Sequence, residues 1–465
     1  MLLIVLVGAI LRLYRLDAQS FWEDEALSSI MAASSLTEIW GNAFASVHPP
    51  GYYSLLYLWR SMVCGTDLAL RFPSALLGVL GIVLTYQLGR DIGDERLGLL
   101  AAGVTALAPY HLCYSQEARM YTLLYCLTCT VMLAYVRLWQ GRGCVWWVVF
   151  VVAALAGLWT HFFAGFVVAL LAGHFCLLWL WRKAGPCWLG FFIGNGVVAL
   201  TFGVYWTRFL SQLDIVASET WRVPPSLNEL VGLPLALIVF QFLSDVWQLV
   251  AFGLLMFLFI VVGLQVVRAL WQRAPGADWL SLLSLLFLVP VITSFVVSQF
   301  WRLIFAPRLL IVVAPALYLL VAWSATHARE YRFNQLVLVL LLPLAMMGFY
   351  RWFFDTSSTK PPVRDAAYLV KESELADAPV MHATAASYKI FIHYASDLDH
   401  HLLSGSPLSL SPDEAYERMG GQLIDPAAYP VTAFGSSSFL STPINSSWRS
   451  VTTLIFASTG NANGT

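Results

Sequence analysis

Long apolar runs dominate the sequence and most constrain how it can fold. In this chain of 465 residues, the recurring runs are roughly 18–20 residues long, the length that a helix needs to cross the hydrocarbon core of a bilayer. The chain is 59% hydrophobic and 11% charged, whereas a soluble domain has about 25% charged residues. The sequence therefore predicts a polytopic α-helical membrane protein.

The hydropathy pattern predicts about eleven transmembrane helices. Their expected positions are roughly 1–16, 73–89, 97–113, 120–137, 145–161, 163–181, 187–208, 247–267, 278–298, 309–325 and 334–350. The first is interpreted as a membrane helix rather than a signal peptide, because it has no basic segment before it and no small-residue cleavage site.

Basic residues in the loops set the expected orientation, because cytoplasmic loops are enriched in Lys and Arg. One side of the predicted bundle carries ten: Arg90, Arg96, Arg137, Arg142, Arg182, Lys183, Arg268, Arg273, Arg329 and Arg332. The other side carries five: Arg119, Arg208, Arg222, Arg302 and Arg308. The richer side is expected to be cytoplasmic, which places the N-terminus inside and the C-terminal segment outside.

Two stretches outside the predicted spans are expected to lie in the membrane interface. The first outer loop, 17–72, contains two interrupted apolar segments, 24–46 and 51–64, which predict amphipathic interfacial helices. Pro49-Pro50 separates them, because proline bars a continuous helix.

The second stretch is residues 211–246. Ser226 and Glu229 have the spacing of a capping box, in which each side chain bonds the other residue's backbone N–H. This spacing predicts a short interfacial helix that begins after Ser226.

The composition changes at about residue 352, after the last predicted span. Residues 1–351 are expected to form the transmembrane domain, and residues 352–465 a small outer domain of mixed α and β structure. Within the latter, the pattern predicts a helix at 364–375 and a strand at 380–383. The Gly- and Asn-rich end, 458–465, is expected to be disordered.

Composition and missing motifs exclude several classes of function. The net charge of -1 argues against a nucleic-acid partner. The sequence has no phosphate-binding loop, no dinucleotide-binding glycine fingerprint and no G-x-S-x-G motif. A soluble nucleotide-sugar enzyme and an ATP-driven pump are therefore not expected.

Glu23, Asp24 and Glu25 form a run of carboxylates just after the first predicted helix. A carboxylate there can take a proton from an acceptor hydroxyl as a general base, or ligate a divalent cation. The structural alternative is that acidic residues stabilise a helix N-terminus. Asp24 and Glu25 are the candidate catalytic residues.

Cationic and aromatic residues near other span ends suit a phosphate or a sugar, because Arg binds phosphate with a planar, permanently charged fork. Arg12 and Arg15 also violate the orientation rule locally, which favours a function for both at the outer face. The structural alternatives are ion pairs at helix ends and aromatic interface anchors. The candidate binding residues are Arg15, His48, Tyr52, Arg71, Glu117, Arg119, Tyr121 and Arg308.

Several tracts in order resemble the GT-C superfamily of bacterial membrane glycosyltransferases. The nearest resemblance is to family 39, the protein O-mannosyltransferase and aminoarabinose-transferase group, and it covers about residues 1–350. The tracts are Trp22-Glu23-Asp24-Glu25-Ala26, His48-Pro49-Pro50-Gly51-Tyr52-Tyr53, Arg71-Phe72-Pro73-Ser74-Ala75, Tyr114-Ser115-Gln116-Glu117-Ala118-Arg119-Met120-Tyr121, Thr160-His161-Phe162-Phe163 and Pro307-Arg308-Leu309-Leu310.

The resemblance implies sugar transfer from a polyprenyl-phosphate donor to a lipid, glycan or protein hydroxyl, with inversion, at the outer face of a bacterial inner membrane. It maps the family's essential acidic residue onto Asp24, with Glu25 beside it. The aminoarabinose enzymes have an acidic-Lys-Pro run where this chain has Val47-His48-Pro49. The resemblance therefore assigns no cofactor and leaves the sugar and a divalent metal open.

Three other functions fit the residues alone. A flippase or transporter of polyprenyl-linked glycans would need cations at the outer face but not Asp24 as a base. A surface-polysaccharide polymerase or ligase would differ in the size of its product. A non-catalytic membrane scaffold would keep its function when Asp24 and Arg119 are replaced.

Overall fold

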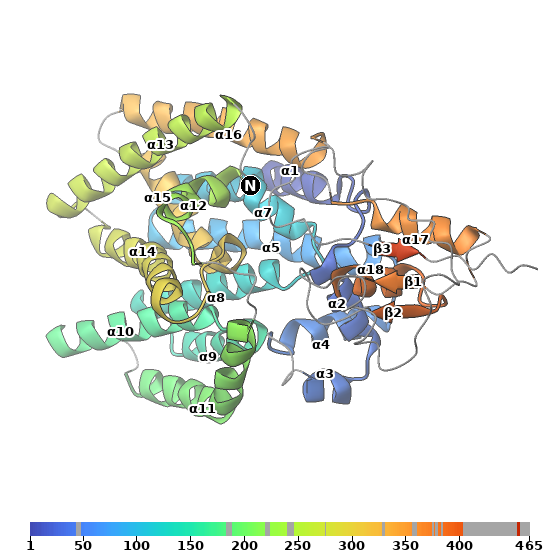
Figure 1. Cartoon of the computed structure of the whole chain (residues 1–465). Helices are drawn as coiled ribbons and strands as arrows, with labels where there is room; N and C mark the ends of the chain where they lie inside the picture. The colour runs from blue at the N-terminus through green and yellow to red at the C-terminus, as the bar shows by residue number, and fades with distance from the viewer. Residues whose placement is uncertain are drawn as a thin grey trace, which may run out of the picture. The chain divides into compact units, whose positions relative to one another are not determined.

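The structure is a computed structural model of the whole chain (Figure 1). It describes residues 1–42, 48–182, 188–218, 224–239, 246–274, 276–327, 331–355, 360–373, 376, 380–382, 385–402 and 453–455. Lys183, Arg222 and Arg329 of the basic loops and the predicted disordered end, 458–465, lie outside this set.

The described chain is mostly helical. Its helices are α1 (Leu2–Leu13), α2 (Glu23–Ala33), α3 (Leu36–Asn42), α4 (Gly51–Arg60), α5 (Asp67–Ile92), α6 (Glu95–Leu107), α7 (Pro109–Ser115), α8 (Tyr121–Trp139), α9 (Val145–Thr160), α10 (Ala164–Arg182), α11 (Trp188–Ser218), α12 (Leu227–Val239), α13 (Val246–Trp271), α14 (Ala277–Phe300), the 3-10 helix η1 (Pro307–Val313), α15 (Ala314–His327), α16 (Tyr331–Phe353), α17 (Val363–Glu372) and α18 (Ala385–Tyr394). The strands are β1 (Val380–His382), β2 (His400–Leu402) and β3 (Thr453–Ile455).

Each of the eleven predicted spans coincides with helix in the described chain, which confirms the polytopic helical class. Within the described residues, six helices are long and apolar enough to cross a membrane, or seven if the bent pair α6–α7 counts as one span. Other apolar helices are shorter: Leu2–Leu13, Val145–Thr160, Ala164–Leu180, Trp188–Gly203 and Leu227–Val239. The total of eleven spans stays a prediction.

The helix predicted to end at 208 continues to Ser218 as α11. Two further spans differ from the sequence prediction at a proline. The span expected to start at Pro73 begins six residues earlier, because Thr66 accepts a hydrogen bond from the Ala69 N–H and starts α5 at Asp67. The single helix expected at 97–113 is two helices, α6 and α7, bent by 62°. The bend falls at Ala108, which is extended because proline follows it.

Arg12 of α1 fills the gap that this bend opens. Its guanidinium is fully buried and donates to the carbonyls of Thr105 and Ala106, at 3.0 and 3.2 Å. These carbonyls lie in the last turn of α6, where a helix leaves its C=O groups without intrahelical partners. Arg12 Nη2 also lies 2.7 Å from Nδ1 of His111 in α7. One side chain thus joins three helices.

The segments predicted to lie in the membrane interface contain short helices. The segment predicted at 24–46 contains α2 and α3, and the segment at 51–64 contains α4. The capping box is confirmed: the Ser226 N–H donates to Glu229 Oε2 at 2.6 Å, and the Glu229 N–H donates to Ser226 Oγ at 3.3 Å. It begins α12.

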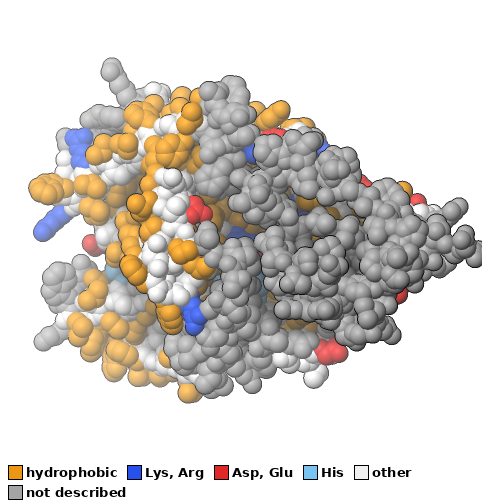
Figure 2. All heavy atoms as spheres, viewed as in Figure 1, with side chains coloured by type: hydrophobic (Ala, Val, Ile, Leu, Met, Phe, Trp, Pro, Cys, Tyr) orange, Lys and Arg blue, Asp and Glu red, His pale blue; other side chains and the backbone are white. Residues whose placement is uncertain are grey.

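Contacts along the chain define two compact units. Unit 1 comprises Met1–Leu16, Ser35–Val63 and Arg71–Phe354, and unit 2 comprises Asp17–Ser34, Cys64–Leu70 and Asp355–Thr465. In unit 1, α8 and α9 pack side by side (Figure 1). Large apolar side chains of α10, α11, α13, α14 and α16 stay exposed, and hydrophobic atoms cover much of the described surface (Figure 2). Lipid would cover such a surface in a membrane protein.

Unit 2 combines segments that are far apart in sequence. Helix α18 packs against both α2 and α17. A small sheet has the strand order β2-β1-β3, with β2 parallel and β3 antiparallel to β1. In this register Val380 of β1 pairs with His400 and Ile455. The helix expected at 364–375 corresponds to α17, and the strand at 380–383 to β1.

Replacing Arg12 should destabilise unit 1. Arg12→Met would leave two buried carbonyls without donors, at about 1–3 kcal/mol each, so the free energy of unfolding should fall by roughly 2–5 kcal/mol. Thermal unfolding of the purified protein in detergent measures this. Arg15→Gln is the matched control, because Arg15 is exposed and should cost at most about 1 kcal/mol. Equal losses in both variants would contradict the assigned role.

Candidate active site

Gln116 anchors the short segment between α7 and α8. Its side-chain nitrogen lies 2.8–3.3 Å from three carbonyls at the end of α1, those of Leu11, Arg12 and Tyr14. The Trp352 indole N–H donates to its amide oxygen at 2.5 Å. The segment that carries Arg119 is therefore fixed from both sides.

Arg119 is fully buried in this segment. Its Nη1 donates to the Tyr53 hydroxyl at 3.3 Å, and its guanidinium carbon lies 5.9 Å from the centre of the Tyr121 ring, within cation–π distance. The Arg119 backbone N–H donates to the Glu117 carbonyl at 2.7 Å in a tight turn. A buried guanidinium framed by aromatic rings is suited to an anion, because little water competes for it.

Tyr52 and Tyr53 stabilise different parts of Arg119. The Tyr52 hydroxyl lies 3.1 Å from Ser74 Oγ, and Ser74 Oγ donates to the Arg119 carbonyl at 3.3 Å. Tyr52 therefore supports the backbone, whereas Tyr53 touches the guanidinium. The sequence singled out Tyr52 and missed Tyr53, since adjacent residues of a helix point about 100° apart and only the packing selects one.

His161 is the C-cap of α9 and lies in the same region as Arg119. It is buried, and the charges of Arg119 and Arg308 act on it. Its Nδ1 accepts the Phe163 N–H at 3.2 Å, so the neutral ring carries its hydrogen on Nε2. The His48 ring centre lies 5.5 Å away. Two arginines and a neutral imidazole donor thus share one region.

Gly51 lets α4 meet the end of α9. A Cβ atom at this position would lie 2.6 Å from the Trp159 carbonyl oxygen, closer than any side chain tolerates. The Pro-Gly step of the His48–Tyr53 tract therefore serves a close backbone approach. This approach places His48 and Tyr53 near His161 and Arg119.

The other predicted cations have different surroundings. Arg71 is buried, and its Nη1 donates to the Leu16 carbonyl at 3.0 Å. Arg15 is exposed, has a left-handed φ of 53°, and donates to the Phe353 carbonyl at 2.8 Å. Arg308 is the second residue of η1 and is half-buried. Of the three, Arg308 is the one whose charge acts on His161.

The acidic run of unit 2 forms the first turn of α2. Lys389 of α18 lies 2.7 Å from Glu23, and Lys360 lies 2.7 Å from Glu25. The Glu25 pair is buried, whereas the Glu23 pair is partly exposed. Asp24 lies between Glu23 and Glu25 in the sequence and is half-buried. The sequence did not identify either lysine, because each lies more than 300 residues from its partner.

Asp67 gathers three side chains of the C-terminal segment. Its carboxylate lies 2.7 Å from the Tyr394 hydroxyl, 3.1 Å from His393 Nε2 and 3.3 Å from Arg364 Nη1. His393 Nδ1 in turn lies 2.9 Å from Ser29 Oγ of α2. The order Ser–His–Asp matches a hydrolase triad, but Ser29 is buried, so the network holds α2 in place.

The described residues contain no group of three or more His, Cys, Asp or Glu side chains arranged to hold a metal. The carboxylates of Glu23 and Glu25 instead have lysine ammonium groups beside them. The divalent metal left open by the sequence is not assigned to any residue.

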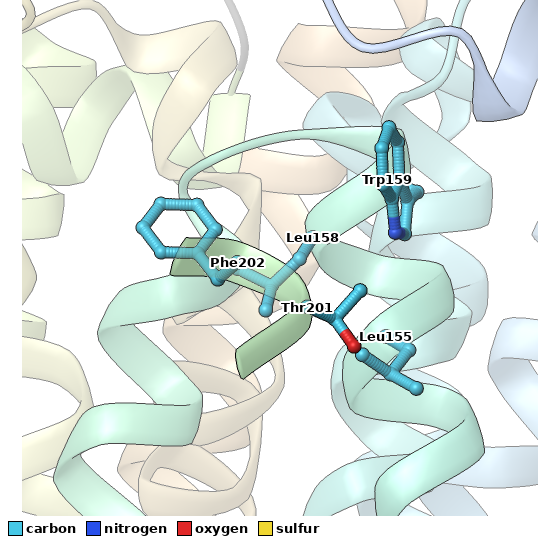
Figure 3. Close-up of a pocket in the computed structure, with 5 residues that line it drawn as sticks. All are labelled: Leu155, Leu158, Trp159, Thr201 and Phe202. Carbon is cyan, nitrogen blue, oxygen red and sulfur yellow. The ribbon is translucent and has the colours of Figure 1, made fainter. Parts of the chain in front are cut away.

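A small apolar pocket lies between α9 and α11 (Figure 3). Its cavity volume is only about 10 Å³, and it is lined by Leu155, Leu158, Trp159, Thr201 and Phe202. The Trp159 ring packs against Trp40 of α3, with 5.1 Å between ring centres. The pocket has no charged lining residue, so it suits a hydrocarbon group, and it lies on the helix that His161 terminates.

Comparison with known proteins identifies the fold that this site belongs to. A family model described as dolichyl-phosphate-mannose-protein mannosyltransferase matches residues 47–206. An uncharacterized protein of Aquifex aeolicus (strain VF5) is 28% identical over 162 residues, which are 34% of this chain and 32% of that protein. The match thus spans about a third of the relative's length.

Solved structures cover more of the chain. ArnT from Cupriavidus metallidurans bound to undecaprenyl phosphate has a TM-score of 0.59 at 14% identity and covers 100% of this chain and 99% of that one. Its apo form gives 0.57 at 13% identity, over 87% and 86%. The apo Archaeoglobus fulgidus oligosaccharyltransferase gives 0.51 at 14% identity, over 86% and 64%. The chain has the GT-C fold, which confirms the resemblance in its sequence tracts.

Proposed function

We propose that the protein is a glycosyltransferase that moves a sugar from a polyprenyl-phosphate donor to an acceptor hydroxyl at the outer face of the membrane. The observation that carries the proposal is a cluster of the fully buried Arg119, the half-buried Arg308 and a neutral His161, within a GT-C fold. ArnT, which has a similar fold, has a solved structure with undecaprenyl phosphate bound. A lipid-linked phosphate is the ligand that such a cluster and an apolar surface suit together.

Asp24 is the proposed general base. It would take the proton of the acceptor hydroxyl while the acceptor oxygen attacks the anomeric carbon and the bond from that carbon to the phosphate oxygen breaks. Positive charge then develops on the sugar, as in other glycosyl transfers. A single displacement of this kind inverts the anomeric configuration.

Arg119 is the proposed ligand of the departing polyprenyl phosphate, with Arg308, His48 and Tyr121 as further candidates. The phosphate gains negative charge as the bond breaks, and donors held in place before the reaction stabilise that charge most. Burial and the Tyr53 contact hold the Arg119 guanidinium in this way. A neutral His161 would add a hydrogen-bond donor without repelling the two arginines.

The lipid tail and the acceptor complete the proposal. The polyprenyl chain would lie in a groove between helices. The acceptor would be a lipid, a glycan or a protein hydroxyl. The orientation predicted from the basic loops puts the N-terminus in the cytoplasm and the C-terminal segment outside, in a bacterial inner membrane.

Replacing the proposed base tests the function directly. The protein would be reconstituted in liposomes with a panel of polyprenyl-phosphate sugars and a crude envelope acceptor, and released polyprenyl phosphate would be measured. Asp24→Asn should lower the release at least about 10²-fold, because an amide cannot take up the proton, while the melting temperature stays unchanged. Wild-type turnover in this variant would contradict the assignment of Asp24 as the base. No release by wild type from any donor would favour transport instead.

Replacing the proposed phosphate ligand gives a second test. Arg119→Gln should lower kcat/KM for donor cleavage by about 10²–10³-fold, the usual cost of losing one transition-state donor. Arg96→Gln is the control, because Arg96 is an exposed cation at the start of α6. A similar loss in both variants would mean that overall positive charge, and not the buried cluster, drives the reaction.

A further inference from the structure

The ion pair between Glu25 and Lys360 differs from the other ion pairs of unit 2. The Glu25 side chain is 0% exposed and Lys360 5%, with 2.7 Å between Oε2 and Nζ. The Glu23–Lys389 pair and the Lys371–Asp397 pair are each at least 30% exposed on both sides. A buried charge that loses its partner is costly and stays uncompensated, whereas exposed pairs contribute little.

Lys360 is itself held in place from the segment that precedes α2. Its backbone N–H donates to Gln19 Oε1 at 3.4 Å, and its ammonium lies 5.9 Å from the Trp22 ring centre. Pro361 and Pro362 follow it and restrict its backbone. The lysine therefore approaches Glu25 from a fixed position.

We propose that Lys360 is a positioning residue for Asp24. It holds the Glu25 carboxylate in a buried ion pair, and so removes one negative charge and one competing proton acceptor from the turn that carries Asp24. The inference rests on the proposed function, because it concerns the same base.

The first turn of α2 shows why such a residue is needed. Three adjacent carboxylates without cations would repel an anionic phosphate donor. Without its cation, buried Glu25 would leave an uncompensated negative charge in the turn that carries Asp24. With Lys360 present, an ammonium group 2.7 Å away balances the charge of Glu25.

Other charged and titratable groups surround the turn from the elements packed against it in unit 2. They are Glu23 on α2, Lys389, His393 and Tyr394 on α18, Asp67 at the start of α5 and Arg364 on α17. Replacing Lys360 or Glu25 leaves all of these unchanged, so paired variants isolate the buried pair.

The test is the pH profile of kcat/KM for donor cleavage, whose acid limb reports the base of the free enzyme. Lys360→Met adds net negative charge beside Asp24, so the acid limb should move to higher pH by roughly one unit. Glu25→Gln leaves net positive charge, so the limb should move to lower pH by a similar amount. The double variant Glu25→Gln with Lys360→Met restores neutrality, and its limb should coincide with that of wild type.

A purely structural ion pair would not produce opposite shifts of the acid limb that cancel in the double variant. Shifts in the same direction, or lost activity with an unmoved acid limb, would overturn the proposal. If Lys360→Met alone does not fold, Glu25→Gln and the double variant still differ in the lysine charge and carry the comparison. Lys371→Met, which breaks the exposed pair with Asp397, is the control and should leave the profile unchanged.

The Asp24→Asn variant separates this inference from the proposed function. Wild-type cleavage by Asp24→Asn would remove the base and with it the role of Lys360. An inactive Asp24→Asn together with unmoved acid limbs in the other variants would overturn the role of Lys360 alone.

Discussion

The carbonyl groups that α6 leaves at its bend are the constraint on which the rest of unit 1 depends. Hydrocarbon offers no water to satisfy them, so Arg12 supplies the missing donors and also reaches His111 of α7. The direction of α7 then determines where Gln116 can bind the end of α1, and Gln116 fixes the turn that presents Arg119. A cation that looked misplaced by the loop-charge rule is thus a structural bridge.

Much of the helical framework could be predicted from the sequence, because a bilayer makes apolar length a direct signal. The capping box at Ser226 was equally readable, since its partners are three residues apart. The bend before Pro109 was not, because an apolar run continues through it and hydropathy does not register the lost hydrogen bonds. Local patterns therefore give the elements, while breaks within them depend on single residues.

The candidate site was predictable in its tracts and less so in its contacts. The sequence singled out Arg119 and Tyr121, which the structure places together, but not Tyr53, which only packing distinguishes from Tyr52. It also gave no sign of Lys360, since the pairing of Glu25 with a residue 335 positions away leaves no periodic trace. Charge pairs between residues far apart in the sequence can be identified only in the folded structure.

The discontinuous make-up of unit 2 has a consequence for biogenesis. Glu25 emerges from the ribosome early, but it cannot meet Lys360 until 335 more residues have been made. At about 5–20 residues per second, this interval lasts roughly 15–70 seconds. During insertion the acidic turn is thus incomplete, and a chain released before Lys360 would lack the cation that accompanies Glu25. Only synthesis past Lys360 allows this pair to form.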